Sequence, residues 1–353
     1  MIRPVALVTG GAGFVGTNLA HRLAQEGYRV RLLDNLSRPG VERNLRWLCD
    51  CHPGRVEAQI ADIRDRDAVR CAIAGIDQVF HLAAQVAVTT SLADPHADYE
   101  VNLGGTVTLL EELRRLSAPP PLVFTSTNKV YGALPDLRLE READRWQPVD
   151  SELRARGLDE SRPLDFCTPY GCSKGGADQY VLDYAKTYSL PAAVFRMSCI
   201  YGPHQHGTED QGWVAHFALR ALADETITLY GDGAQVRDVL WVADLVDAFL
   251  RVRDGIDSLA GTAFNVGGGP DNAVSLLEVV DLIGDLRGER PHVEFAPERP
   301  GDQRYYVADT LRLQRATGWR PRVSVPDGIE ELYYWLRERS RAGARAALGV
   351  AAR

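Results

Sequence analysis

A glycine-rich turn directly after an apolar segment constrains the fold of this chain more than any other feature. The run VTGGAGFVG extends from Val8 to Gly16 and has glycines at 10, 13 and 16. In such a turn Gly10 permits the tight bend, Gly13 lets backbone N–H groups approach a pyrophosphate, and Gly16 lets the strand and the following helix pack closely. The turn therefore predicts a strand–turn–helix unit that binds a dinucleotide; a glycine-rich turn without a ligand is the alternative.

The pattern around this turn predicts an α/β fold with a doubly wound parallel sheet of the Rossmann type. We expect strands at 5–10, 29–34, 56–62, 78–84, 121–127 and 192–198, and helices at 15–26, 65–74, 98–115 and 169–188. The stretch 128–168 reads as an irregular excursion, and the alternation fades after 198. Further helices are expected near 213–223, 242–253, 275–287 and 326–340.

This pattern also suggests how the chain divides. We expect residues 1–196 plus 236–263 to form the dinucleotide-binding domain, residues 197–235 plus 264–340 a smaller C-terminal substrate-binding lobe, and the Ala/Arg-rich segment 341–353 a flexible tail. A chain of 353 residues is long enough for both units.

The amino-acid composition limits the kinds of partner that the protein can bind. Lys and Arg total 40 against 48 Asp and Glu, a net charge of −8, and no run of basic residues occurs, so we expect no nucleic acid partner. No segment approaches the ~20 apolar residues of a membrane span. The six cysteines have neither metal-site nor disulfide spacing, which favours a reducing compartment, and we expect a cytoplasmic protein.

Asp34 ends the second predicted strand, about 20 residues after the central glycine of the turn. A carboxylate at this place accepts hydrogen bonds from the adenosine ribose hydroxyls and repels a 2′-phosphate, so the expected cofactor is NAD rather than NADP. Arg38 is close enough in sequence to leave NADP open, although a solvated loop charge is the favoured interpretation.

The sequence YGCSK, from Tyr170 to Lys174, opens a predicted helix and is the strongest catalytic signal. One helical turn separates the two side chains, so they share a face, and an ammonium beside a phenol is expected to lower the phenol's pKa. Thr127 ends the fifth predicted strand, where its hydroxyl can hold a substrate oxygen. The alternative for the YxxxK pair is an ordinary amphipathic helix face.

The spacing GxxGxxG, together with Thr127, Tyr170 and Lys174, resembles the short-chain dehydrogenase/reductase superfamily in its extended form. The resemblance implies NAD as cofactor and these three residues as the catalytic set. The cofactor contacts it implies are Gly10, Gly13, Phe14, Val15, Gly16, Asp34, Asn35, Ser37, Arg38, Asp62, Ile63, Leu82, Ala83, Ala84, Gln85, Asn102, Thr125, Ser126, Tyr170 and Lys174.

The residues after Thr127 discriminate among activities within the superfamily. Its 4,6-dehydratases have Asp-Glu there and its decarboxylases keep a glutamate, whereas this chain has Asn128 and Lys129, which implies epimerisation. The blocks at 34–48, 85–91, 126–132, 159–185, 210–214 and 231–245 resemble the CDP-paratose 2-epimerase (CDP-tyvelose epimerase) family. Segment 196–210 departs from that pattern. UDP-sugar 4-epimerase, a net dehydrogenase or reductase, and a non-catalytic NAD(H)-binding regulator remain alternatives.

The resemblance also implies a nucleotide-sugar site in which Arg237 and Arg299 clamp the pyrophosphate and Asp302 holds a ribose hydroxyl; surface ion pairing is the alternative for the arginines. Thr90 is expected near the sugar. The expected substrate contacts are Gln85, Thr89, Thr127, Asn128, Ser198, His204, Gln211, Arg237, Arg299 and Asp302.

Two further features bear on ligand binding and assembly. His204 and His206 form an HxH pair, but two ligands make a poor metal site without a third such as Asp210, so we expect no metal. The resemblance implies that the helices at 98–115 and 169–188 pack across a homodimer as a four-helix bundle; a homotetramer is also open.

Overall fold

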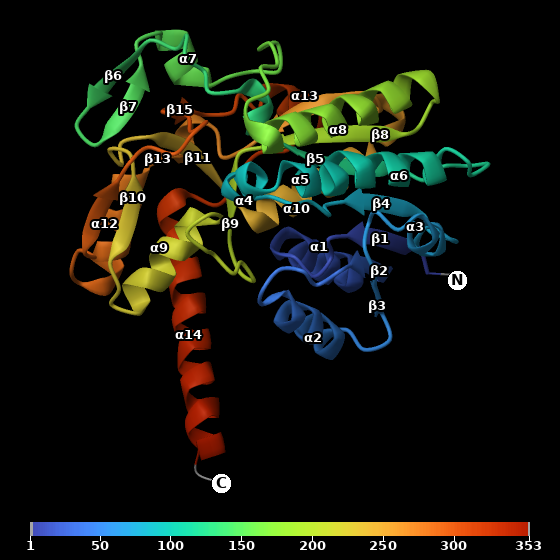
Figure 1. Ribbon diagram of the computed structural model, residues 1–353, viewed down its shortest axis with the longest axis horizontal. Coiled ribbons are helices and arrows are strands. Elements are labelled where there is room, and N and C mark those ends of the chain that lie inside the picture. Colours follow the sequence, from blue (N-terminus) through green and yellow to red (C-terminus); the bar gives the residue numbers. More distant parts are fainter. Residues whose placement is uncertain (1–2, 352–353) are drawn as a thin grey trace.

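A seven-stranded parallel sheet is the largest sheet of the chain (Figure 1). The computed structural model describes residues 3–351, with side chains up to Arg341. The strand order is β12-β8-β5-β4-β1-β2-β3, and every neighbouring pair is parallel. The strands are β1 (Val5–Thr9), β2 (Arg29–Asp34), β3 (Val56–Ile60), β4 (Gln78–His81), β5 (Leu122–Thr127), β8 (Ala192–Met197) and β12 (Ala263–Val266). The predicted doubly wound α/β fold is confirmed.

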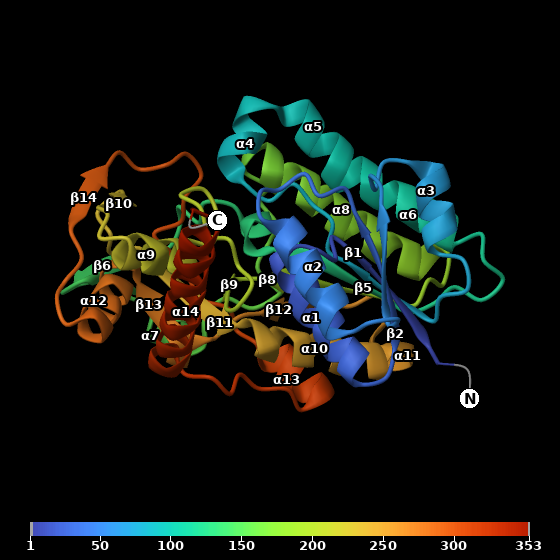
Figure 2. The same cartoon turned by 90° about the horizontal axis from the view of Figure 1, so that it is seen from below.

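Helices cover both faces of this sheet, so its central strands are buried throughout, as is usual for parallel sheets (Figure 2). One face packs against α1 (Phe14–Gln25) and α10 (Val242–Asp254), with α2 (Val41–Cys51) beyond α1. The other packs against α3 (Arg66–Ala72), α6 (Gly105–Leu113) and α8 (Thr168–Thr187). Helix α2 was not predicted, although Val41, Leu45 and Leu48 have helical spacing and pack on its inner side.

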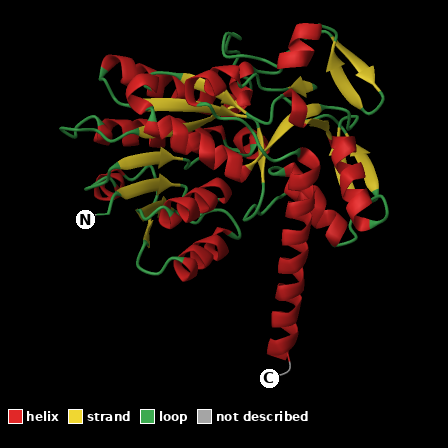
Figure 3. Cartoon of the chain, turned by 180° about the vertical axis from the view of Figure 1, so that it is seen from behind, coloured by secondary structure: helices red, strands yellow, loops and turns green. Residues whose placement is uncertain are grey.

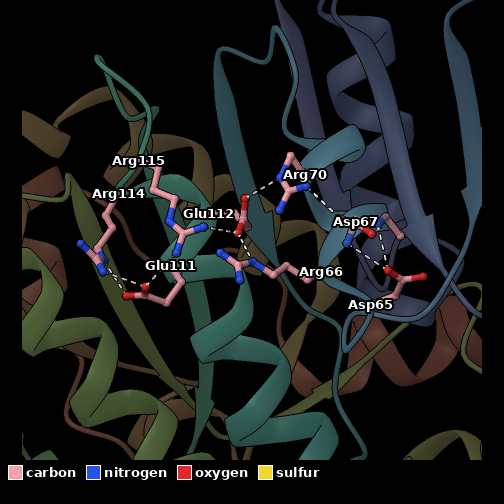
Figure 4. Close-up of polar contacts among 9 residues, drawn as sticks. Asp65, Arg66, Asp67, Arg70, Glu111, Glu112, Arg114 and Arg115 are labelled. Carbon is pink, nitrogen blue, oxygen red and sulfur yellow. Dashed lines mark hydrogen bonds and ion pairs between the residues drawn. The ribbon is translucent and has the colours of Figure 1, made fainter.

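The outer ends of α3 and α6 are joined by ion pairs (Figure 4). The Glu112 side chain is buried and accepts hydrogen bonds from Arg66 at 2.5 Å, Arg70 at 3.1 Å and Arg115 at 3.1 Å. None of these residues lines the cavity described below. The cluster therefore acts as a structural connection between two helices.

The predicted helix at 98–115 is broken into three pieces. Helix α5 (Pro95–Tyr99) leads into a π-helical turn, η1 (Glu100–Gly104), which continues as α6. Single π turns inside helices are frequent at functional sites. This turn places the side chain of Asn102 in the protein interior.

The lobe is built on two small sheets (Figure 3). In one, β11 (Val236–Trp241) pairs with β9 (Cys199–Tyr201), β13 (Ala273–Ser275) and β15 (Tyr305–Tyr306); the other pairs β10 (Ile227–Tyr230) with β14 (Val293–Ala296). A separate core joins them to α9 (Trp213–Leu222), α12 (Leu276–Arg287) and α14 (Val325–Ala351). Other short helices are α4 (Val88–Ala93), α11 (Ile256–Leu259), η3 (Pro270–Asn272) and α13 (Leu311–Thr317).

The structure corrects the predicted domain limits at two strands. Residues 236–241 were assigned to the dinucleotide-binding domain, yet β11 is the central strand of a lobe sheet. Residues 264–266 were assigned to the lobe, yet β12 is the edge strand of the large sheet. The prediction assumed that neighbouring segments share a sheet, whereas the chain changes sheet twice here.

The excursion at 128–168 is more ordered than predicted. It contains η2 (Asn128–Tyr131), a hairpin of β6 (Leu139–Glu142) and β7 (Arg145–Pro148), and α7 (Ser151–Arg156). Apolar residues from this segment share a core with the lobe residues 305–308, and the hairpin lies beside β15 in Figure 1. This part of the predicted dinucleotide-binding domain therefore packs on the lobe.

The C-terminal helix is longer than predicted. It was expected at 326–340, whereas α14 runs to Ala351 and so enters the segment expected as a tail; residues 352 and 353 lie outside the described part. Within the described residues, no helix is both long and apolar enough to cross a bilayer.

Candidate active site

The glycine-rich turn has the geometry of a phosphate-binding turn. Gly10 has φ 67°, and its N–H donates to Leu33 O at 2.8 Å. A Cβ on Gly16 would stand 2.3 Å from Gly10 O, so no larger residue fits the close packing there. Gly13 caps α1 without a side-chain acceptor, and a Cβ on it would meet only Gly10 O. No side chain of the described residues caps the start of α1, so its first N–H groups are available to a pyrophosphate.

Asp34 lies beside this turn at the end of β2. Its carboxylate accepts hydrogen bonds from Ala12 N at 3.0 Å and Leu36 N at 2.8 Å, which fixes its orientation and leaves lone pairs for further donors. Arg38, expected to be a solvated loop charge, is instead half-buried, and burial lowers its pKa.

The other residues expected to contact the cofactor follow successive strands, because the carboxyl ends of parallel strands meet at one edge of the sheet. They are Asn35 and Ser37 after β2, Asp62 and Ile63 after β3, Leu82, Ala83 and Ala84 after β4, and Thr125 and Ser126 at the end of β5. Asp62 is held by Arg64 and Asn35, and its pKa is lowered to about 2, chiefly by the Arg64 hydrogen bond. The Ser126 hydroxyl is buried with no hydrogen-bond partner among the described residues, so it is free for a ligand. These residues fit a bound dinucleotide.

Thr127 and Tyr170 come together at a cavity of about 370 Å³ between the large sheet and the lobe. Thr127 ends β5, and its hydroxyl donates to Asn128 Oδ1 at 3.3 Å while accepting from the backbone N–H of Lys129 at 3.2 Å. Tyr170 lies in the first turn of α8, where its N–H donates to Ser91 Oγ at 3.2 Å and its hydroxyl is hydrogen-bonded to Thr127. Lys174 is buried behind them, with Nζ 4.4 Å from the centre of the Phe124 ring.

The expectation that Lys174 lowers the pKa of Tyr170 is wrong for the described structure. Burial raises the pKa of Tyr170 to about 12, against the opposing effect of the Thr127 hydrogen bond. Burial also lowers the pKa of Lys174 to about 7, opposed by the carboxylates of Asp178 and Asp98. Burial therefore shifts the pKa of each group in the direction that stabilises its neutral form.

Eight of the ten expected substrate residues line the cavity: Thr89, Thr127, Asn128, Ser198, Gln211, Arg237, Arg299 and Asp302. Arg237 pairs with Asp302 at 2.7 Å, and Arg299 stacks on Tyr230 with 3.7 Å between its guanidinium carbon and the ring centre. The Thr89 hydroxyl is buried without a hydrogen-bond partner in the described structure. Two cationic residues and a free hydroxyl thus surround one cavity.

The structure does not bring His204 into this cavity. Its side chain is 5% exposed, with ring-centre distances of 4.1 Å to Trp47 and 5.2 Å to Trp335, and burial lowers its pKa to about 4. His206 instead lies 3.2 Å from Asn44 Oδ1. Contacts to α2 and α14, distant in sequence, decide these orientations. No group of three or more His, Cys, Asp or Glu side chains in the described residues is placed to hold a metal ion.

Gln85 also turns away from the cavity, and its amide donates to Asp98 Oδ1 at 2.8 Å. Asn102 does not line the cavity either, but its side chain bonds the backbone of Gln85 through both of its polar atoms. Sequence reasoning missed two charged residues here. Lys129 lines the cavity and donates to Gly301 O at 3.1 Å, and the buried carboxylate of Asp98 carried no recognisable motif.

A Rossmann sheet whose glycine turn lies next to a threonine, a tyrosine and a buried lysine defines a short-chain dehydrogenase/reductase-type active site. Comparison with known proteins agrees. Residues 6–267 match the NAD dependent epimerase/dehydratase family, and the chain belongs to that family. The predicted family resemblance and NAD dependence are thereby confirmed.

Individual relatives are similar over nearly their full length. The chain is 41% identical over 336 residues to a CDP-paratose 2-epimerase of Salmonella typhi, which spans 93% of this chain and 98% of that protein. It is 34% identical over 341 residues to a UDP-glucose 4-epimerase of Mycolicibacterium smegmatis, with 95% and 99% covered. The structure of a Thermus thermophilus UDP-glucose 4-epimerase complex with NAD superposes with a TM-score of 0.79 at 34% identity, covering 94% of this chain and 99% of that one.

Proposed function

We propose that this protein is an NAD-dependent nucleotide-sugar epimerase, an isomerase that inverts carbon 2 of a CDP-linked hexose. The observation that carries the proposal is that one cavity is lined by Thr127 and Tyr170 and also by Arg237 and Arg299. The threonine and tyrosine suit a sugar hydroxyl, and the arginines suit a pyrophosphate.

The protein's own residues would act on the sugar hydroxyl as follows. Thr127 holds the hydroxyl oxygen, and Tyr170 accepts its proton and later returns it. NAD, when bound, supplies a cationic ring that accepts hydride from the sugar carbon and gives it back. Because the pKa of Tyr170 is about 12 in the described structure, its role as base requires positive charge to enter the cavity.

The anionic half of the substrate would be held by groups that pair with carboxylates in the described structure. Arg237 contacts Asp302, and Arg299 lies 3.4 Å from Asp210 and donates to Glu209 O at 3.0 Å. A pyrophosphate offers these guanidinium groups bidentate acceptors. Since the chain as a whole carries a charge of −8, these local arginines supply the attraction for an anion.

The residues beside Thr127 favour epimerisation over elimination. Expelling water from the sugar needs an additional acid and base, and neither Asn128 nor Lys129 is a carboxyl group. Asn128 donates to Gln303 Oε1 at 3.2 Å and Lys129 is bound to the loop at 301–302, so both side chains serve to hold the site together. Oxidation and re-reduction at one carbon needs only Tyr170 as its proton carrier.

The choice of a CDP-sugar and of carbon 2 is supported by the 41% identity to the CDP-paratose 2-epimerase. We further propose a homodimer formed by the outer surface of α4 (Val88–Ala93), α5 and α8. Large apolar side chains are exposed there, among them Leu92 at 45%, Tyr99 at 53% and Tyr180 at 46%. Light scattering on the purified protein would test this assembly.

Incubation with CDP-, UDP-, GDP- and TDP-linked hexoses, with the products identified by NMR, tests the function. We expect a gluco-configured CDP-sugar to become its manno epimer without net consumption of added cofactor. A galacto product from the UDP-sugar would support carbon-4 epimerisation instead, and a 4-keto-6-deoxy product would show that the site performs elimination.

A further inference from the structure

The carboxylate of Asp98 is almost completely buried next to the catalytic residues. Asp98 lies near the end of α5, and only 1% of its surface is exposed. It has no ion-pair partner within 4.0 Å among the described residues, and its hydrogen bonds all come from uncharged groups. Burying a charge without an ion-pair partner is costly, so the hydrogen bonds to this carboxylate must offset that cost.

Three segments of the site meet at this carboxylate. Oδ1 accepts from Gln85 Nε2 at 2.8 Å and from Asn102 Nδ2 at 3.1 Å, and Oδ2 accepts from the hydroxyl of Ser173. Gln85 belongs to the loop after β4, Asn102 to the π turn η1, and Ser173 to the helix residues between Tyr170 and Lys174. One side chain thus connects the loop, the π turn and the catalytic helix.

The residues that bind Asp98 are also hydrogen-bonded to one another. Asn102 Nδ2 also lies 3.0 Å from Ser173 Oγ, and its Oδ1 accepts from Gln85 N at 2.8 Å. The Ser173 hydroxyl lies 3.2 Å from Tyr170 O. Movement of the carboxylate would therefore reach the backbone of the catalytic tyrosine through one intermediate residue.

The charge of Asp98 also bears on the two titrating groups of the site. Burial has the largest effect on the pKa of Lys174 and lowers it. The carboxylates of Asp178 and Asp98 act in the opposite direction and raise it. Asp178 is already neutralised by two hydrogen bonds from the buried guanidinium of Arg196, at 2.9 and 3.0 Å. Asp98 has no such partner, so its charge is the less compensated of the two.

We propose that Asp98 is a positioning residue of the epimerase site: its buried carboxylate aligns the catalytic segment of α8 with the loop after β4 and supplies a negative charge beside Lys174 that no ion-pair partner among the described residues compensates. The inference rests on the proposed function for its catalytic meaning. The geometry and charge can be tested without a substrate.

The chain offers a direct readout, because it contains three lysines, Lys129, Lys174 and Lys186. NMR of the holoprotein with ¹³C-labelled lysine, assigned by single Lys→Arg variants, gives the titration midpoint of each. In Asp98→Asn the midpoint of Lys174 should fall by about one pH unit, the scale expected when one nearby opposite charge is removed. Lys186, at the far end of α8, should not move.

Ser173→Ala is the matched control. It removes one hydrogen bond to Asp98 and keeps the charge, so the Lys174 midpoint should stay at its wild-type value. If Asp98→Asn folds poorly, Asp98→Ser provides a second neutral variant with the same expected shift. An unchanged Lys174 midpoint in a folded neutral variant, or an equal shift in Ser173→Ala, would overturn the proposal.

The pH profile of epimerisation gives a second readout. The titratable groups of α8 on which the charge of Asp98 acts are Tyr170, Cys172 and Lys174. Helix α4 has no titratable residue. In the segment that contains Asp98, His96 and Tyr99 are exposed and Glu100 is half-buried. Burial raises the pKa of Tyr170 and the Thr127 hydrogen bond lowers it. The negative charge of Asp98 is a smaller effect that raises this pKa. Loss of the charge should therefore move both limbs of the profile to lower pH.

The Lys174 midpoint and the assay of sugar conversion test the role of Asp98 and the proposed reaction separately. A shifted Lys174 midpoint in a protein that converts no CDP-hexose would retain the role of Asp98 and refute the proposed reaction. Conversion of the sugar by the Asp98→Asn protein with a wild-type pH profile and midpoint would refute the role of Asp98 alone.

Discussion

Replacement of Tyr170 by phenylalanine separates catalysis from folding. The ring is retained, and in the described structure the phenol loses its hydrogen bond to Thr127, which keeps its contacts with Asn128 and Lys129. A hydrogen bond of this kind contributes ~0.5–1.5 kcal/mol to stability. Removal of the general base should lower epimerisation ~10²–10⁴-fold, or roughly 3–5 kcal/mol in the barrier.

The assay is product formation from a CDP-hexose by NMR, alongside urea unfolding and quantification of bound cofactor. Tyr184→Phe is the matched control, because Tyr184 lies on the same helix, is buried, and loses a comparable hydrogen bond at 2.7 Å to Glu111 Oε1. It should retain wild-type activity. A Tyr170→Phe protein that keeps activity within a few-fold, or a Tyr184→Phe protein that loses as much, would refute the assignment of the base.

The remaining predictions concern the turn and the core. Gly16→Ala should yield folded protein without bound NAD, because the added Cβ stands 2.3 Å from Gly10 O. The wild-type protein should release NAD rather than NADP on denaturation. Asp178→Ala should cost ~3–5 kcal/mol in urea unfolding, because it leaves a buried arginine unpaired, whereas Asp136→Ala breaks an exposed pair and should cost ~1 kcal/mol or less. Burial lowers the pKa of His81 to about 3. The contribution of His81 to the free energy of unfolding is therefore fully present above pH 6.5 and should be lost at ~1.4 kcal/mol per pH unit as the pH drops from 6.5 toward 3; a His81→Gln chain with the same pH dependence as wild type would contradict this.

Local spacing explains why the glycine turn and the pairing of Tyr170 with Lys174 could be predicted. The turn residues are neighbours in sequence, and the tyrosine and lysine lie one helical turn apart. Thr127 and Asp34 end parallel strands, whose carboxyl ends meet at one edge of the sheet whatever the loops do. These relations need no knowledge of distant contacts.

Features set by distant contacts could not be predicted. The sheets to which β11 and β12 belong are decided by the strands with which they pair, and those strands lie far along the chain. His204 turns inward because Trp47 and Trp335 lie on either side of it. The raised pKa of Tyr170 reflects burial by the whole fold, which the spacing of a motif cannot show.

The assignment of the reacting carbon is tested most directly by deuterium placed at single positions of a CDP-hexose. Deuterium at carbon 2 should slow epimerisation and remain at carbon 2 of the manno product, because the hydride returns to the carbon it left. Deuterium at carbon 4 should leave the rate unchanged. An isotope effect confined to carbon 4, together with a galacto product, would contradict the proposed reaction.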